Sequence, residues 1–122
     1  MLLFRSLSGR SLPRVTDGPL LGAAALLFAG CAAGEEVVWR WFVFGGLSPR
    51  IGWPAALLVS TLGFAATHVR ARTLRPVRVH ILTGATFGSI YVLTGRLVAA
   101  IVCHAAYNVL IALKLAELDE AS

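Results

Sequence analysis

The chain alternates between long apolar stretches and short polar stretches that carry most of its arginines. The four longest apolar stretches run from about 18 to 47, 53 to 69, 79 to 93 and 97 to 115. A helix needs about 20 apolar residues to cross the hydrocarbon core of a bilayer. The third stretch is the weakest and contains the most glycine. The pattern predicts an all-α fold, a polytopic bundle of about four transmembrane helices.

Turn-forming residues mark the ends of these helices and divide the chain. Ser48, Pro49 and Arg50 are expected to end the first helix, and Pro54 fits the first turn of the second, where its missing N–H does no harm. We expect an N-terminal arm over 1–16, which carries three arginines and suits a membrane surface. A helical domain then covers 17–116, and a polar tail covers 117–122.

Composition supports the membrane assignment. The chain has 122 residues, enough for one domain, with 57% hydrophobic and 14% charged residues and a mean hydropathy of +0.78. Soluble domains carry about 25% charged residues. A secreted protein with a cleaved signal peptide is excluded, because the apolar segments recur along the whole chain.

The net charge of +5 does not indicate a nucleic-acid partner, because the arginines are not interleaved with stacking aromatic residues. They lie between apolar stretches, as topology signals do. With four spans, one side of the membrane holds only Arg50 and Arg96. We therefore expect a multi-pass protein of a cell membrane, specifically a bacterial inner membrane, with both termini cytoplasmic. The basic residues of that cytoplasmic side are Arg5, Arg10, Arg14, Arg70, Arg72, Arg75, Arg78 and Lys114.

Two adjacent acids, Glu35 and Glu36, lie within the first apolar stretch. A carboxylate in the bilayer core costs about 2.5–3.5 kcal/mol even on lenient insertion scales, so each needs a partner or a function. Glu36 and Arg40 are four residues apart, share a helix face and are predicted to form a structural ion pair. Glu35 is rotated about 100° from that face and has no such partner.

Polar residues of three predicted helices fall at similar depths. Counted from the outer helix ends at about 1.5 Å per residue, Glu35 is roughly 18 Å deep, His68 22 Å, His104 10 Å and Asn108 16 Å. Singly, each histidine or asparagine is most simply an interhelical hydrogen-bonding group. Together they predict a functional site within the membrane. His80 is placed at the cytoplasmic start of the third helix, outside this layer.

Three short motifs resemble those of a known family. Residues 35–40 read EExxxR, residues 64–68 read FxxxH and residues 104–108 read HxxxN, each on its own predicted helix. In this order they resemble the CPBP family (CAAX protease and bacteriocin-processing, also called Abi) of intramembrane proteases. The resemblance covers about 32 to 113.

The resemblance implies hydrolysis of a peptide bond within the membrane. Glu35 would be the general base that activates water, assisted by His68, and His104 and Asn108 would stabilise the oxyanion. The substrate would be a membrane-associated protein or peptide, for instance a C-terminal tail.

Two features depart from the family pattern. Trp41 replaces the glycine that commonly follows the arginine of the first motif, and family members usually carry extra helices before that motif. The chain is then a minimal member, a homo-oligomer or a sequence without its full start. Glu36 and Arg40 would hold the helix rather than take part in catalysis.

The need for a metal stays open at this point. Glu35, His68 and His104 could form a zinc site with an open fourth position. No HExxH helix is present, and Glu36, the one carboxylate placed to support such ligands, is expected to pair with Arg40. Catalysis by glutamate without a cofactor is therefore favoured over zinc.

Two other functions compete with the protease. One is a non-catalytic membrane scaffold or immunity protein on the same fold, for which the glutamates would be structural. The other is a small proton-coupled transporter, since glutamate and histidine also form proton relays. Four spans without an inverted repeat make the transporter less favoured.

Overall fold

The computed structural model describes residues 18–69 and 74–120, and all regular structure in these ranges is helical. This confirms the all-α prediction. The N-terminal arm expected over 1–16 lies outside the described residues. The elements are α2 (Gly18–Glu36), η1 (Val37–Phe44), α3 (Gly45–Ile51), α4 (Trp53–Thr67), α5 (Leu74–Thr94) and α6 (Leu97–Glu120).

The first three elements follow one another without a break, and η1 in their middle is π-helical. The predicted end of this helix at 48–50 was wrong, because the helix continues to Ile51. Pro49 lies in its last turn, where its missing N–H removes a helix hydrogen bond shortly before the helix ends. The chain turns instead at Gly52, whose φ of 80° is a left-handed conformation that glycine adopts without strain.

Two other boundaries differ from the prediction. α5 begins at Leu74, before the expected start at 79, because Pro76 occupies its first turn, where a missing N–H is tolerated. The connection between α4 and α5 is correspondingly short. α6 continues to Glu120, into the segment expected as a polar tail. Leucine, alanine and glutamate dominate that segment, and all three are good helix formers.

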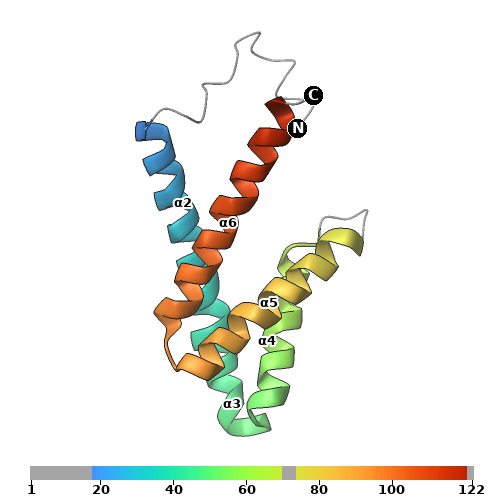
Figure 1. Ribbon diagram of the computed structural model, residues 1–122. Helices are drawn as coiled ribbons and strands as arrows, with labels where there is room; N and C mark the ends of the chain where they lie inside the picture. The colour runs from blue at the N-terminus through green and yellow to red at the C-terminus, as the bar shows by residue number, and fades with distance from the viewer. Residues whose placement is uncertain (1–17, 70–73, 121–122) are drawn as a thin grey trace.

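The helices pack as two pairs. α2 lies beside α6, and α4 lies beside α5 (Figure 1). η1 contacts α4, α2 and α6, so it joins the two pairs where they meet. Residues at the end of α2 and in η1 can therefore reach both α4 and α6.

Close contact between α4 and α5 depends on two glycines of α5. A Cβ atom at Gly84 would lie 2.9 Å from Cδ1 of Phe64, and one at Gly88 would lie 2.4 Å from Cδ1 of Leu57. Both distances are shorter than real Cβ contacts. The small residues spaced four apart thus let the two helices approach closely, as such patterns do in membrane proteins.

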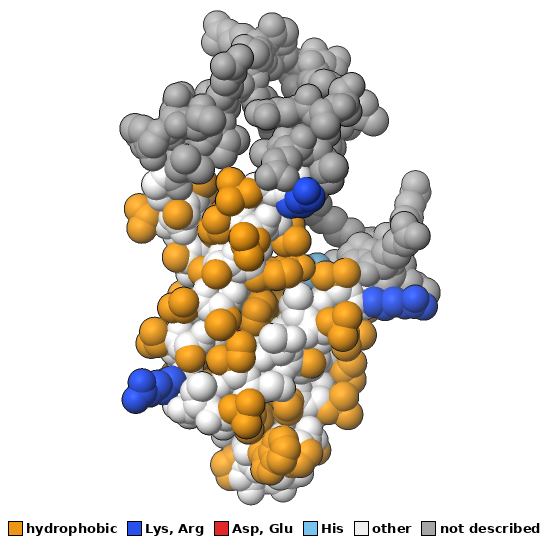
Figure 2. All heavy atoms as spheres, viewed as in Figure 1, with side chains coloured by type: hydrophobic (Ala, Val, Ile, Leu, Met, Phe, Trp, Pro, Cys, Tyr) orange, Lys and Arg blue, Asp and Glu red, His pale blue; other side chains and the backbone are white. Residues whose placement is uncertain are grey.

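The outer surface is strongly apolar. Hydrophobic side chains cover much of the face in Figure 2, Lys and Arg lie at its margins, and no acidic side chain of a described residue is visible there. By length and composition, two of the described helices could cross a membrane, Gly22–Ile51 and Leu97–Lys114, while the apolar helix Trp53–Thr67 is shorter. The count of about four spans stays a prediction.

Candidate active site

Glu35 and Glu36 are the last two residues of α2, and their side chains lie in different surroundings. The side chain of Glu36 is fully buried, whereas that of Glu35 is 35% exposed. Both directly precede the π-helical η1. π-Helical segments occur frequently at functional sites, where they change the direction in which side chains point. The rotation of about 100° between successive helical residues turns these two neighbouring carboxylates to different faces of α2.

Glu36 contacts two cationic or polar partners, one with each oxygen. Its Oε2 lies 3.0 Å from Nε of Arg40, which is equally buried, and its Oε1 lies 2.8 Å from Nδ1 of His104. The sequence predicted the contact with Arg40 from the spacing of four residues. It did not predict the contact with His104, which joins the end of α2 to α6.

Arg40 has two further partners. Its Nη2 donates a hydrogen bond of 2.9 Å to the carbonyl oxygen of Gly84 on α5, and its guanidinium lies 5.1 Å from the ring centroid of Phe64 on α4. An arginine over an aromatic face gains electrostatic attraction from the ring. One buried cation thus connects η1 to both helices of the second pair.

Glu35 lies between the two predicted histidines. Its Oε1 is 3.7 Å from Nε2 of His68, and its Oε2 is 3.6 Å from Nε2 of His104. These separations exceed a normal hydrogen bond and suit bridging water. Within the described part of the chain, the buried Oε2 has no hydrogen-bond partner. The carboxylate is therefore an acceptor that faces two imidazoles.

His68 follows the last residue of α4, and its tautomer can be inferred. Its Nδ1 lies 2.9 Å from the carbonyl oxygen of Phe64, which can only accept a hydrogen bond. Nδ1 therefore carries the proton, and Nε2 of the neutral ring presents a lone pair toward Glu35. The ring also packs on that of Phe64, with centroids 4.7 Å apart.

His104 is held more tightly, with its side chain only 5% exposed. The ring stacks on Phe87 of α5, with centroids 4.4 Å apart and planes inclined by 17°. The carboxylate of Glu36 accepts a hydrogen bond from Nδ1. Nε2 is thus the ring nitrogen that faces Glu35.

Asn108 lies one helical turn beyond His104 on α6 and is half-buried. Among the described residues, no hydrogen bond reaches its side-chain amide. The structure brings Glu35, His68 and His104 into contact, while Asn108 shares only the helix with His104.

His80 belongs to this cluster, and its placement outside the layer was wrong. Its ring stacks on that of His68, with centroids 4.1 Å apart and planes inclined by 23°. The two residues lie on either side of the short connection between α4 and α5, so they are at the same level of the bundle. Treating 70–78 as a loop concealed this, because α5 already begins at Leu74.

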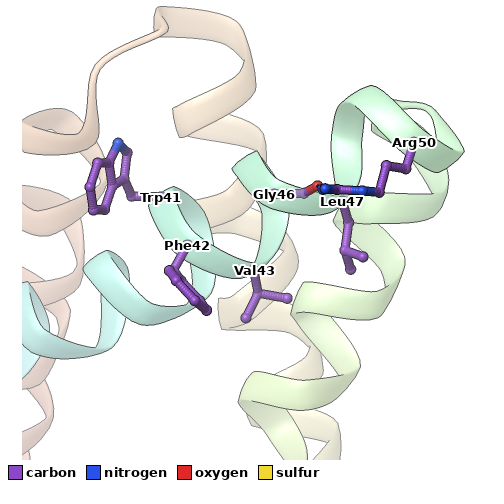
Figure 3. Close-up of a pocket in the computed structure, with 6 residues that line it drawn as sticks. All are labelled: Trp41, Phe42, Val43, Gly46, Leu47 and Arg50. Atoms are coloured by element: carbon purple, nitrogen blue, oxygen red, sulfur yellow. The ribbon is translucent and has the colours of Figure 1, made fainter.

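The cluster opens into a pocket of ≈350 Å³. A larger hollow of ≈680 Å³ lies along η1 and α3, but its lining includes neither Glu35 nor a histidine, and its side chains spread along the helices without converging (Figure 3). The smaller pocket is therefore the one next to the reactive groups. Its lining residues are Gly34, Glu35, Val38, Trp39, Thr67 and His68.

A metal ion at this cluster would have to bind Nε2 of His68 and Nε2 of His104, the ring nitrogens that face Glu35. In the described ranges, no group of three or more His, Cys, Asp or Glu side chains is placed to hold a metal ion. Nδ1 of His104 is engaged by Glu36 and Nδ1 of His68 by a backbone carbonyl. These contacts leave Nε2 of both rings beside the carboxylate of Glu35, at 3.7 Å for His68 and 3.6 Å for His104.

A helical bundle with an apolar outer surface and an acid–imidazole cluster inside it fits the class of membrane-embedded hydrolases. A family model described as type II CAAX prenyl endopeptidase Rce1-like matches residues 17–110. The chain belongs to this Rce1-like family of membrane proteases, which confirms the resemblance inferred from the three motifs. No curated protein and no solved structure matches the chain.

Proposed function

We propose that this chain is an intramembrane endopeptidase that hydrolyses a peptide bond of a membrane-associated protein or peptide with water activated by Glu35. The observation that carries the proposal is the position of the Glu35 carboxylate, within 3.7 Å of one imidazole nitrogen and 3.6 Å of another, beside an open pocket. A general base must lie within hydrogen-bond reach of the water that it deprotonates.

Water is bound and deprotonated between Glu35 and His68. Both Oε1 of Glu35 and the unprotonated Nε2 of His68 accept hydrogen bonds, so one water can donate to both across their 3.7 Å separation. This orientation leaves a lone pair of the water oxygen free to attack the substrate carbonyl carbon. Glu35 takes the proton as the new C–O bond forms.

The attack gives a tetrahedral intermediate whose oxyanion needs donors. Since Nδ1 of His104 already donates to Glu36, its Nε2 can donate only when the ring is an imidazolium. Two carboxylates lie beside this ring, that of Glu36 2.8 Å from Nδ1 and that of Glu35 3.6 Å from Nε2. The amide NH₂ of Asn108 supplies a second donor from the same helix.

Collapse of the intermediate completes the reaction. Glu35 returns its proton to the leaving nitrogen, the C–N bond breaks, and the products are a new C-terminal carboxyl group and a free amine. Glu36 and Arg40 take no part in proton transfer in this scheme. They fix the position of His104 relative to Glu35, because Glu36 contacts both Arg40 and His104.

The test uses purified full-length chain and a quenched fluorescent peptide that ends in a prenylated C-a-a-X sequence, the substrate type named for the family. Glu35→Gln keeps size and hydrogen bonding but cannot accept the proton, so kcat should fall about 10²–10⁴-fold. Circular dichroism should show the helical content of the wild type.

The controls separate the protease from its alternatives. Cleavage by Glu35→Gln at the wild-type rate would show that Glu35 is not the general base. A wild type that leaves the peptide intact would contradict hydrolysis of this substrate class and favour a non-catalytic scaffold or immunity protein. Chelator treatment should leave wild-type activity unchanged. Loss of activity on chelation, with recovery on added zinc, would replace the glutamate mechanism by a metal-dependent one.

A further inference from the structure

α5 places one flat ring against each histidine of the site. His80 stacks on His68 with centroids 4.1 Å apart, and Phe87 stacks on His104 with centroids 4.4 Å apart. His80 and Phe87 are seven residues apart, so they lie two turns apart on one face of the helix. The near-parallel planes, inclined by 23° and 17°, are those of aromatic stacking.

We propose that His80 is a positioning residue, whose ring holds the imidazole of His68 in the plane that directs Nε2 toward Glu35. The inference rests on the proposed function, because it concerns the histidine that orients the attacking water. His80 acts through His68, since the ring contacts of His80 are with His68 and Phe64.

His68 requires such support because it lies beyond the regular part of α4. Its backbone has φ −99° and ψ 3°, outside the helix, and its side chain is 27% exposed. Its hydrogen-bonding contacts, the carbonyl oxygen of Phe64 and the hydroxyl of Thr67, both belong to α4. These contacts fix the Nδ1 edge of the ring and leave rotation about that edge open.

The stack with His80 restricts that rotation from a second helix. A ring that turns about its Nδ1 edge would lose the near-parallel contact with His80. α5 is itself fixed nearby, because the carbonyl oxygen of Gly84, one turn beyond His80, accepts a hydrogen bond from the buried Arg40. The position of the His68 ring is thereby tied to the same buried ion pair that holds His104.

His80→Leu and His80→Phe test this role in the cleavage assay. Leucine has no flat ring, whereas phenylalanine keeps the stack without an ionisable group. We expect His80→Leu to lower kcat about tenfold with KM within about twofold of wild type, because misplaced catalytic groups slow the chemical step. His80→Phe should recover kcat to within about twofold.

The matched control is Leu82→Ala, a change on α5 at a side chain that is 68% exposed and two residues from His80. Its kcat should equal that of wild type. Circular dichroism checks that each variant is helical, and His80→Gln replaces His80→Leu if the latter does not fold, since glutamine also lacks a ring.

The outcomes distinguish this inference from the function on which it rests. Unchanged kcat in the ringless variant, with Glu35→Gln inactive, would overturn the positioning role and leave the protease intact. An equal loss of kcat in His80→Leu and His80→Phe would also overturn it, because the flat ring would then not explain the effect of His80 on kcat. Full activity of Glu35→Gln would overturn the proposal that Glu35 activates the attacking water, on which this inference rests.

Discussion

Glu35 and Glu36 are the same residue type one position apart, yet they occupy opposite environments. Glu36 is fully buried and contacts Arg40 at 3.0 Å and His104 at 2.8 Å. Glu35 is 35% exposed and approaches its two histidines no closer than 3.6 Å. The rotation between successive helical residues turns one carboxylate toward the interior and the other toward the pocket.

The two carboxylates differ in how closely their contacts hold them. Short contacts with a cation and an imidazole fix Glu36, and a fixed charge can hold neighbouring groups in place. Longer separations around Glu35 leave space for water and for a substrate carbonyl. In the proposed mechanism the fixed carboxylate positions His104 and the other one activates water, and this helix carries both in adjacent positions.

The largest expected effect is a loss of folding stability on substitution of Glu36. Glu36→Gln leaves Arg40 buried without a counter-charge, and removal of one partner of a buried ion pair destabilises by about 3–5 kcal/mol. Unfolding of the purified protein by SDS in mixed micelles measures this. Glu36→Gln combined with Arg40→Gln should be less destabilised than Glu36→Gln alone, because no lone charge remains. A double variant that is worse than the single one would show that the pair itself is not the cause.

The second-largest effect should come from the two proposed oxyanion donors on α6. His104→Ala and Asn108→Ala each remove a proposed oxyanion donor, and loss of one such donor lowers kcat about 10²–10³-fold. Cleavage of the prenylated peptide by folded variants measures this, with KM determined in parallel. A large rise in KM at constant kcat would assign these residues to substrate binding instead.

The smallest effect should come from filling the pocket beside Glu35. Gly34 lines it, and a Cβ atom there meets nothing within 4 Å. Gly34→Leu should raise KM about tenfold, because a pocket filled by a side chain excludes the substrate. Gly30→Leu is the matched control, since that glycine lies one turn earlier in equally open space. Equal KM values for both variants would mean that substrate enters elsewhere.

Local spacing made part of this site predictable. The contact between Glu36 and Arg40 follows from the helix period, which needs no tertiary information. Counting residues along the predicted helices put Glu35, His68 and His104 in one layer, and the structure brings these side chains together. The motifs also led to the family, which the family model confirms.

Other features depend on tertiary structure and had no sequence signal. A carboxylate has two oxygens, and only the packing of α6 shows that the second oxygen of Glu36 meets His104. The π-helical turns of η1 leave no periodic pattern in a stretch that is apolar except for Arg40. His80 was misplaced because the start of α5 was set at the last arginine, although charged residues fit the first turns of a helix as well as a loop.

Arg40 and His104, the two partners of Glu36, are also synthesised at different times. Arg40 follows four residues later on the same helix, so this charge is neutralised as soon as that helical turn forms. His104 lies 68 residues further along the chain. Because chains fold from the N-terminus as they are synthesised, the charge of Glu36 enters the lipid already compensated by Arg40. The cluster of Glu35, His68 and His104 is complete only after α6 has been made, so the proposed protease would be inactive in the nascent chain before then.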